Sequence, residues 1–126
     1  MAKRVGLVGV TGYTGMELTR ILLDHPGLRL TQVTSRKEAG QPLRKIYPFL
    51  QGTEFGELEI TAPDTSYMAA NCDLVFLAVP HGTAMEMAAE LREKGARVVD
   101  LSADFRLRDR EVYESWYGVT HTREAL

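Results

Sequence analysis

Cysteine and long apolar runs are what this sequence lacks most plainly. Its 126 residues contain one cysteine, Cys72. A single cysteine excludes an intrachain disulfide framework and a zinc site built from several cysteines. No apolar stretch is long enough to span a bilayer, and the N-terminus lacks the apolar core of a signal peptide. We therefore expect a cytoplasmic protein.

An excess of charge of either sign is also missing. Fifteen Lys and Arg residues stand against 17 Asp and Glu, which gives a formal net charge of −2. No overall basic field favours nucleic acid or an anionic membrane, so we expect neither as a partner. A hydrophobic fraction of 44% and a charged fraction of 25% are ordinary for a globular protein. The length suits one domain with a single core.

Strand-like and helix-like segments alternate along the chain. The apolar patterns predict strands over residues 3–10, 28–35, 58–61, 72–80 and 96–102. Helices are predicted over residues 15–27, 82–95 and 108–118. This alternation favours an α/β fold with a mostly parallel sheet.

The predicted helices each present an apolar face. In the first helix this face comprises Leu18, Ile21 and Leu22. In the second helix it comprises Ala84, Met87, Ala88 and Leu91, with Thr83 as the N-cap. Residues 36–56 have several prolines and glycines and little periodicity, so we expect a long loop there with one helical turn at most.

Three glycines follow the first predicted strand at a spacing of three: Gly9, Gly12 and Gly15. Glycines between a strand and a helix permit a tight turn, a close approach of backbone to pyrophosphate, and close packing of the helix on the strand. The helix N-terminus attracts phosphate, and Thr11 and Thr14 add hydroxyl donors. The pattern therefore predicts a dinucleotide-binding loop. The alternative is a glycine-rich turn that serves packing only.

The end of the second predicted strand indicates which dinucleotide binds. An NAD-binding domain usually has Asp or Glu there, bonded to the ribose 2′-hydroxyl. This chain instead has Ser35, Arg36 and Lys37. An arginine can bind a 2′-phosphate with two hydrogen bonds, so we favour NADP over NAD. The alternative is a solvated basic turn.

Other candidate residues follow the later strands. Ligands bind outside the carboxyl ends of the strands in open α/β sheets, which places Pro80, His81 and Gly82 near the nicotinamide. For His81 the alternative is a surface histidine near a helix start. Cys72 precedes its strand and should lie at the opposite edge as a small buried hydrophobe rather than a nucleophile.

Several motifs together resemble one family. The segments "GVTGYTG", "TSR", "FLAVPHG", "VVDLSADFRL" and "WYG" occur in this order and spacing in N-acetyl-γ-glutamyl-phosphate reductases. The resemblance implies NADPH-dependent reduction of an acyl phosphate to its aldehyde in arginine biosynthesis, with release of phosphate. It also implies a Rossmann-type, doubly wound sheet with helices on both faces. A catalytic and dimerisation domain follows in the family, so a full-length protein is expected to form a homo-oligomer.

The resemblance also implies roles for individual residues. Gly12, Tyr13, Thr14 and Gly15 would hold the pyrophosphate, and Ser35 and Arg36 the phosphorylated adenosine ribose. Pro80, His81 and Gly82 would lie by the nicotinamide half, with Ser102 nearby. No metal ligand is implied.

One part of the family pattern has no counterpart in this sequence. Family members attack the acyl phosphate with a cysteine in a "HPGCYPT"-like segment downstream of "WYG", and no residue here matches it. We therefore expect residues 1–126 to be the NADP-binding domain, an N-terminal fragment of a longer two-domain reductase that is inactive alone. An aminoadipyl-phosphate reductase of lysine biosynthesis, a more distant aspartate-semialdehyde dehydrogenase, or a non-catalytic NADP-binding sensor remain as alternatives.

Overall fold

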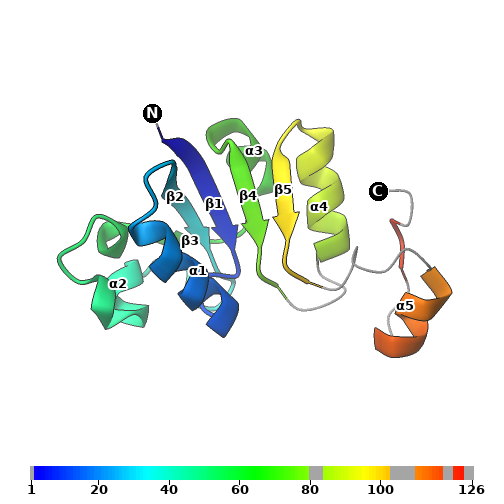
Figure 1. Ribbon diagram of the computed structural model, residues 1–126, viewed down its shortest axis with the longest axis horizontal. Helices are drawn as coiled ribbons and strands as arrows, with labels where there is room; N and C mark the ends of the chain where they lie inside the picture. The colour runs from blue at the N-terminus through cyan, green and yellow to red at the C-terminus, as the bar shows by residue number, and fades with distance from the viewer. Residues whose placement is uncertain (1, 80–83, 103–109, 118–120, 124–126) are drawn as a thin grey trace.

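A parallel β-sheet forms the centre of the computed structural model, which describes residues 2–79, 84–102, 110–117 and 121–123. Within these residues the sheet has five strands in the order β3-β2-β1-β4-β5 (Figure 1). The strands are β1 (Lys3–Val8), β2 (Leu28–Thr34), β3 (Ile60–Thr61), β4 (Leu74–Leu77) and β5 (Arg97–Asp100). All neighbouring strands run parallel, so the predicted α/β fold is confirmed.

Helices cover both faces of the sheet. The helices of the described residues are α1 (Tyr13–Leu23), α2 (Leu43–Ile46), α3 (Thr65–Asn71), α4 (Ala84–Glu93) and α5 (Arg110–Tyr117), with 3₁₀ turns η1 (Pro48–Leu50) and η2 (Phe55–Glu57). Helix α1 packs on one face, and α3 and α4 pack on the other (Figure 1). Each face has its own apolar cluster, as a doubly wound sheet requires.

The buried faces of the helices follow the predictions with one exception. On α4, Ala84, Ala88 and Leu91 are buried and Met87 packs beside them, as predicted. On α1, Leu22 is buried but Ile21 is 53% exposed, so its predicted place on the apolar face is wrong. Successive helical residues lie about 100° apart, and Ile21 falls outside the stripe that faces the sheet. The predicted N-cap Thr83 lies outside the described residues.

Residues 36–56 are more ordered than predicted. The segment holds one α-helical turn, α2, and two 3₁₀ turns begin within it, η1 and η2. Leu43, Leu50 and Phe55 are at most 2% exposed and belong to the same core cluster as β1 and β2. The predicted long loop therefore contains three short turns where one was expected, and its side chains contribute to the core. Each turn is too short to show a helical period in the sequence.

Helix α3, which connects β3 to β4, was not predicted. Its N-cap is Asp64, whose side chain accepts a hydrogen bond from the Tyr67 N–H at 3.0 Å. Met68 is the buried residue that fixes α3 to the sheet. None of the helices in the described part of the chain has the length and apolar character needed to cross a bilayer.

The buried role of residues 36–56 can be tested with two neighbouring residues. Leu50 is fully buried, whereas Phe49 is 48% exposed. We expect Leu50→Ala to lower the free energy of unfolding by about 2–5 kcal/mol, because it leaves a cavity in the core. Phe49→Ala should cost about 1 kcal/mol or less. Urea denaturation measures both, and equal small losses would contradict a core role for the segment.

Candidate functional site

A cleft opens at the carboxyl edge of the sheet, where β1 lies between β2 and β4. From β1 the chain adds β2 and β3 on one side of the sheet and then crosses to add β4 and β5 on the other. The strand order therefore reverses at β1, which is where open α/β sheets bind their ligands. The cleft has a volume of about 380 Å³. Its lining includes five of the predicted site residues: Gly9, Thr11, Gly12, Ser35 and Arg36.

Two of the three glycines are required by the backbone itself. Gly9 has a φ of +83°, and a Cβ there would lie 2.2 Å from the carbonyl oxygen of Ala78. Only glycine allows β1 to turn this close to the end of β4. At Gly15 a Cβ would lie 2.5 Å from the carbonyl oxygen of Val10, so glycine here lets α1 pack directly beneath the loop.

Gly12 has no such internal requirement. Its φ is −84°, and a Cβ added there would meet nothing within 4 Å. The residue borders the cleft, so the space that a side chain would fill is open to a ligand. In dinucleotide-binding loops a glycine of this kind lets a phosphate group approach the backbone closely. Gly12 therefore favours a ligand-binding loop over a turn that serves packing only.

The N-terminus of α1 supplies hydrogen-bond donors beside Gly12. Gly12 is the N-cap, no side chain caps the helix there, and the first turn contains no acidic residue. The first intrahelical bond runs from the Met16 N–H to the Gly12 carbonyl at 2.9 Å. The N–H groups of Tyr13 and Thr14 precede it, and with the helix dipole they favour an anion. Both of these residues are exposed.

The predicted ribose-binding residues differ in their surroundings. Ser35 is 7% exposed, its N–H donates to the Thr61 carbonyl at 3.0 Å, and its Oγ accepts from the Glu38 N–H at 3.4 Å. Ser35 thus holds the turn after β2. Arg36 and Lys37 are exposed at the rim of the cleft. Within the described part of the chain, no ion pair involves Arg36.

A second hollow of about 620 Å³ shares Arg36 with the cleft and is lined on its other side by carboxylates of α4. Glu86 is paired with Arg123 at 2.7 Å, and Glu90 accepts a hydrogen bond from the Thr65 hydroxyl at 2.8 Å. These carboxylates therefore already have partners. Arg36 lies between the two hollows, and its side chain lines both of them.

Tyr47 contributes to the site and was not predicted. It lies between α2 and η1 and is 7% exposed. Its side chain reaches the glycine loop, residues 9–15, from the side away from the cleft. Its hydroxyl donates to the carbonyl of Val10 at 2.7 Å and lies 3.2 Å from the carbonyl of Gly12. Burial raises the pKa of this hydroxyl above its usual value. No motif in the sequence links Tyr47 to the loop, because 37 and 35 positions separate the partners.

Four further residues were predicted near the nicotinamide: Pro80, His81, Gly82 and Ser102. Pro80, His81 and Gly82 lie outside the described residues, so their predicted place beside the nicotinamide stays a prediction. Ser102 is not among the residues that line the cleft; its N–H donates to Asp100 Oδ1 at 2.8 Å just after β5.

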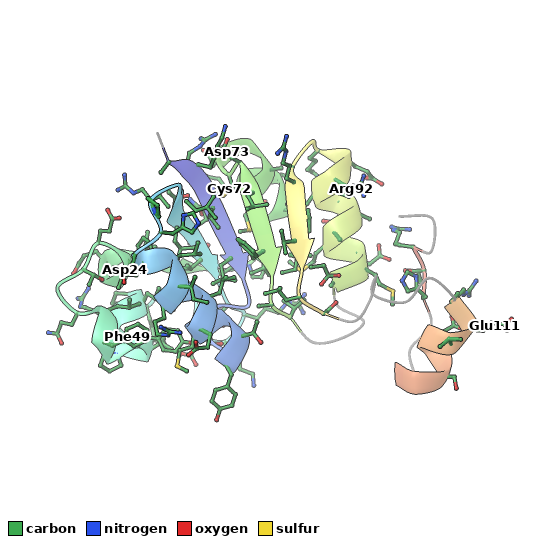
Figure 2. All side chains as sticks on the ribbon, in the orientation of Figure 1. Asp24, Phe49, Cys72, Asp73, Arg92 and Glu111 are labelled. Carbon is green, nitrogen blue, oxygen red and sulfur yellow. The ribbon has the colours of Figure 1, made fainter. Side chains whose placement is uncertain are left out.

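Cys72 lies where the sequence placed it, at the opposite edge of the sheet. Figure 2 shows it at the ends of the strands away from the arrowheads. It is 5% exposed, and burial raises the pKa of its thiol. A buried thiol with a raised pKa is a poor nucleophile, and the predicted position and burial of Cys72 are confirmed.

The strand order, the glycine turn and the open helix N-terminus define a class: a dinucleotide-binding domain of Rossmann type. The profile of the family "Semialdehyde dehydrogenase, NAD binding domain" matches residues 4–125. The chain belongs to this family and is therefore a nicotinamide-dinucleotide-binding domain.

Relatives in the sequence comparison are N-acetyl-gamma-glutamyl-phosphate reductases. The protein of Marinobacter nauticus is 55% identical over 94% of this chain, and that of Nitrosococcus oceani is 48% identical over 98%. The resemblance inferred from the motifs is thereby confirmed. This chain covers 33% and 35% of the two relatives, so it spans about a third of their length.

Solved structures of low sequence identity share the fold. Aspartate semialdehyde dehydrogenase with NADP from Candida albicans superposes with a TM-score of 0.71 at 20% identity, over 87% of this chain and 32% of that one. A semialdehyde dehydrogenase NAD-binding protein from Cupriavidus necator, in complex with calcium and NAD, gives 0.57 at 23%, over 82% and 34%. The Rossmann-type fold is confirmed.

The different requirements at two glycines of the loop can be tested directly. We expect Gly9→Ala to lower the free energy of unfolding by more than about 2 kcal/mol. An alanine there would need a strained positive φ, and its Cβ would clash with the Ala78 carbonyl oxygen. Gly12→Ala should cost about 1 kcal/mol or less, because it meets no atom and changes only the N-cap. Thermal unfolding compares the two variants. Equal losses would contradict the open surroundings of Gly12.

Proposed function

We propose that residues 1–126 form the NADP-binding domain of a longer two-domain reductase. That enzyme converts N-acetyl-γ-glutamyl phosphate to N-acetylglutamate semialdehyde in arginine biosynthesis. The observation that supports this best is the identity of about 50% to reductases of that name over nearly the whole chain, together with an open glycine loop at the switch point. The reaction uses hydride from NADPH to reduce an acyl phosphate to an aldehyde and releases phosphate.

In this proposal the glycine loop holds the pyrophosphate of the cofactor. The N–H groups from Gly12 to Gly15 donate to its oxygens, and the hydroxyls of Thr11 and Thr14 add further donors. The open position at Gly12 lets the phosphate approach the backbone. Pro80, His81 and Gly82 then border the nicotinamide half, with Ser102 farther along the same edge.

NADP rather than NAD is the proposed cofactor. Arg36 is exposed at the rim of the cleft, and Ser35 stands where an NAD-binding domain usually has a carboxylate. The nearest acid along the chain, Glu38, accepts a hydrogen bond from Gln41 Nε2 at 2.7 Å and does not line the cleft. Among the described residues the Arg36 guanidinium makes no ion pair, which suits a contact with the 2′-phosphate.

The chemistry at the acyl group is assigned to another part of the enzyme. Cys72 lies at the edge of the sheet opposite the cleft and is buried. The proposed role of this domain is therefore to bind and orient NADPH. Selection of the substrate and formation of a homo-oligomer are assigned to the second domain of the longer protein.

Titration of the chain with NADP and with NAD at one salt concentration tests this function. We expect NADP to bind more tightly, and Arg36→Ala to weaken NADP binding about tenfold or more while NAD binding changes little, because a charge-assisted bond is lost. Arg92→Ala is the matched control, since Arg92 lies on α4 at the far edge of the sheet (Figure 2).

The outcomes separate the parts of the proposal. Equal binding of both cofactors by the unsubstituted chain would contradict the assignment of Arg36 to a 2′-phosphate. No binding of either cofactor would contradict the cofactor-binding role as a whole. An equal effect of Arg92→Ala would show that the lost affinity reflects total charge rather than a specific contact.

A further inference from the structure

The buried hydroxyl of Tyr47 anchors the glycine loop from behind. Tyr47 belongs to the core cluster of β1 and β2, and its ring centroid lies 5.9 Å from that of Phe49. Its hydroxyl reaches two carbonyls of the loop, Val10 at 2.7 Å and Gly12 at 3.2 Å. Nothing about packing a ring into an apolar cluster requires a hydroxyl, which must find a polar partner when buried.

The hydroxyl has one proton, so its main hydrogen bond is to the Val10 carbonyl and the Gly12 carbonyl takes the weaker share; both carbonyls turn toward it. The described residues contain no cis peptide bond. In a trans peptide the C=O and the following N–H point in opposite directions. Since the carbonyls of Val10 and Gly12 turn inward to Tyr47, the N–H groups of Thr11 and Tyr13 must point outward. Thr11 lines the cleft, and Tyr13 is the first residue of α1.

The same bonds remove acceptors from the side of the loop that faces a ligand. A carbonyl oxygen turned toward a phosphate repels it, whereas an N–H attracts it. The Gly12 carbonyl is also held by the Met16 N–H of α1 at 2.9 Å, whereas the Val10 carbonyl, in the peptide that precedes Thr11, is held by the Tyr47 hydroxyl at 2.7 Å. Tyr47 is the side chain that contacts both of the peptide units concerned.

We propose that Tyr47 is a positioning residue that holds the Thr11 N–H group outward, beside the Tyr13 N–H group that α1 itself orients, for the pyrophosphate of the bound dinucleotide. This inference rests on the proposed cofactor site and adds a specific cause for its affinity. The segment from α2 to η2 then has a function besides filling the core, because it carries the hydroxyl to the back of the loop. Burial raises the pKa of Tyr47, so the hydroxyl remains a donor throughout the neutral range.

The test compares two ligands that share only the adenosine end. NADPH contains the pyrophosphate, whereas 2′-AMP has the 2′-phosphate and no 5′-phosphate. Tyr47→Phe keeps the ring and removes the hydroxyl, so the core stays filled. Tyr67→Phe on α3 is the matched control, since Tyr67 is 53% exposed and lies outside the cleft lining. NADPH fluorescence gives one dissociation constant, displacement by 2′-AMP gives the other, and thermal unfolding reports stability.

We expect Tyr47→Phe to raise the dissociation constant of NADPH about five- to tenfold, the usual effect of one lost hydrogen bond, and to leave that of 2′-AMP within about twofold. Tyr67→Phe should change neither. A lower melting temperature with both constants unchanged would overturn the inference and leave a purely structural tyrosine. An equal rise for both ligands would also overturn it. Failure of the unsubstituted chain to bind NADPH would instead refute the cofactor site itself, and the inference with it.

Discussion

The close approach of Gly9 to the end of β4 is the constraint on which the site depends. The chain leaves β1 with a positive φ, and the N–H groups of Gly9 and Val10 both donate to the Thr34 carbonyl at 3.1 Å. These contacts tie the end of β1 to the ends of its two neighbours, β2 and β4. They also fix where α1 starts, and hence where its free N–H groups lie relative to the cleft. A side chain at Gly9 would separate these strand ends and displace the donors together.

A second layer of structure supports this turn from the side away from the cleft. Residues between β2 and β3 form three short turns whose buried side chains complete the core under α1. Gly56 illustrates how closely these turns pack, because a Cβ there would lie 2.4 Å from the carbonyl oxygen of Leu50. The hydroxyl of Tyr47 extends from this layer to the glycine loop. The stability of the domain and the geometry of its anion site therefore share the same residues.

The sequence was sufficient where the relevant interactions are local or periodic. Apolar runs located the five strands that the described residues form, and the glycine spacing located the loop. Strand burial and turn geometry each leave a pattern in a few consecutive residues. The seven residues of α3 and the single turns of α2, η1 and η2 are too short to show a helical period. Tyr47 could not be found at all, since its role depends on a contact between segments far apart in the chain. The cofactor preference at Arg36 depends on a ligand contact and stays a prediction.

The central claim is that the outward N–H groups at the start of α1 bind the pyrophosphate of the dinucleotide. Amide resonances of the isotopically labelled chain, followed during titration with inorganic pyrophosphate and then with NADP, test it most directly. The account predicts that the largest shift changes fall on Thr11, Tyr13, Thr14 and Gly15 with both ligands, and that NADP adds changes at Arg36. Saturable binding of NADP that leaves those four amides unchanged would contradict it.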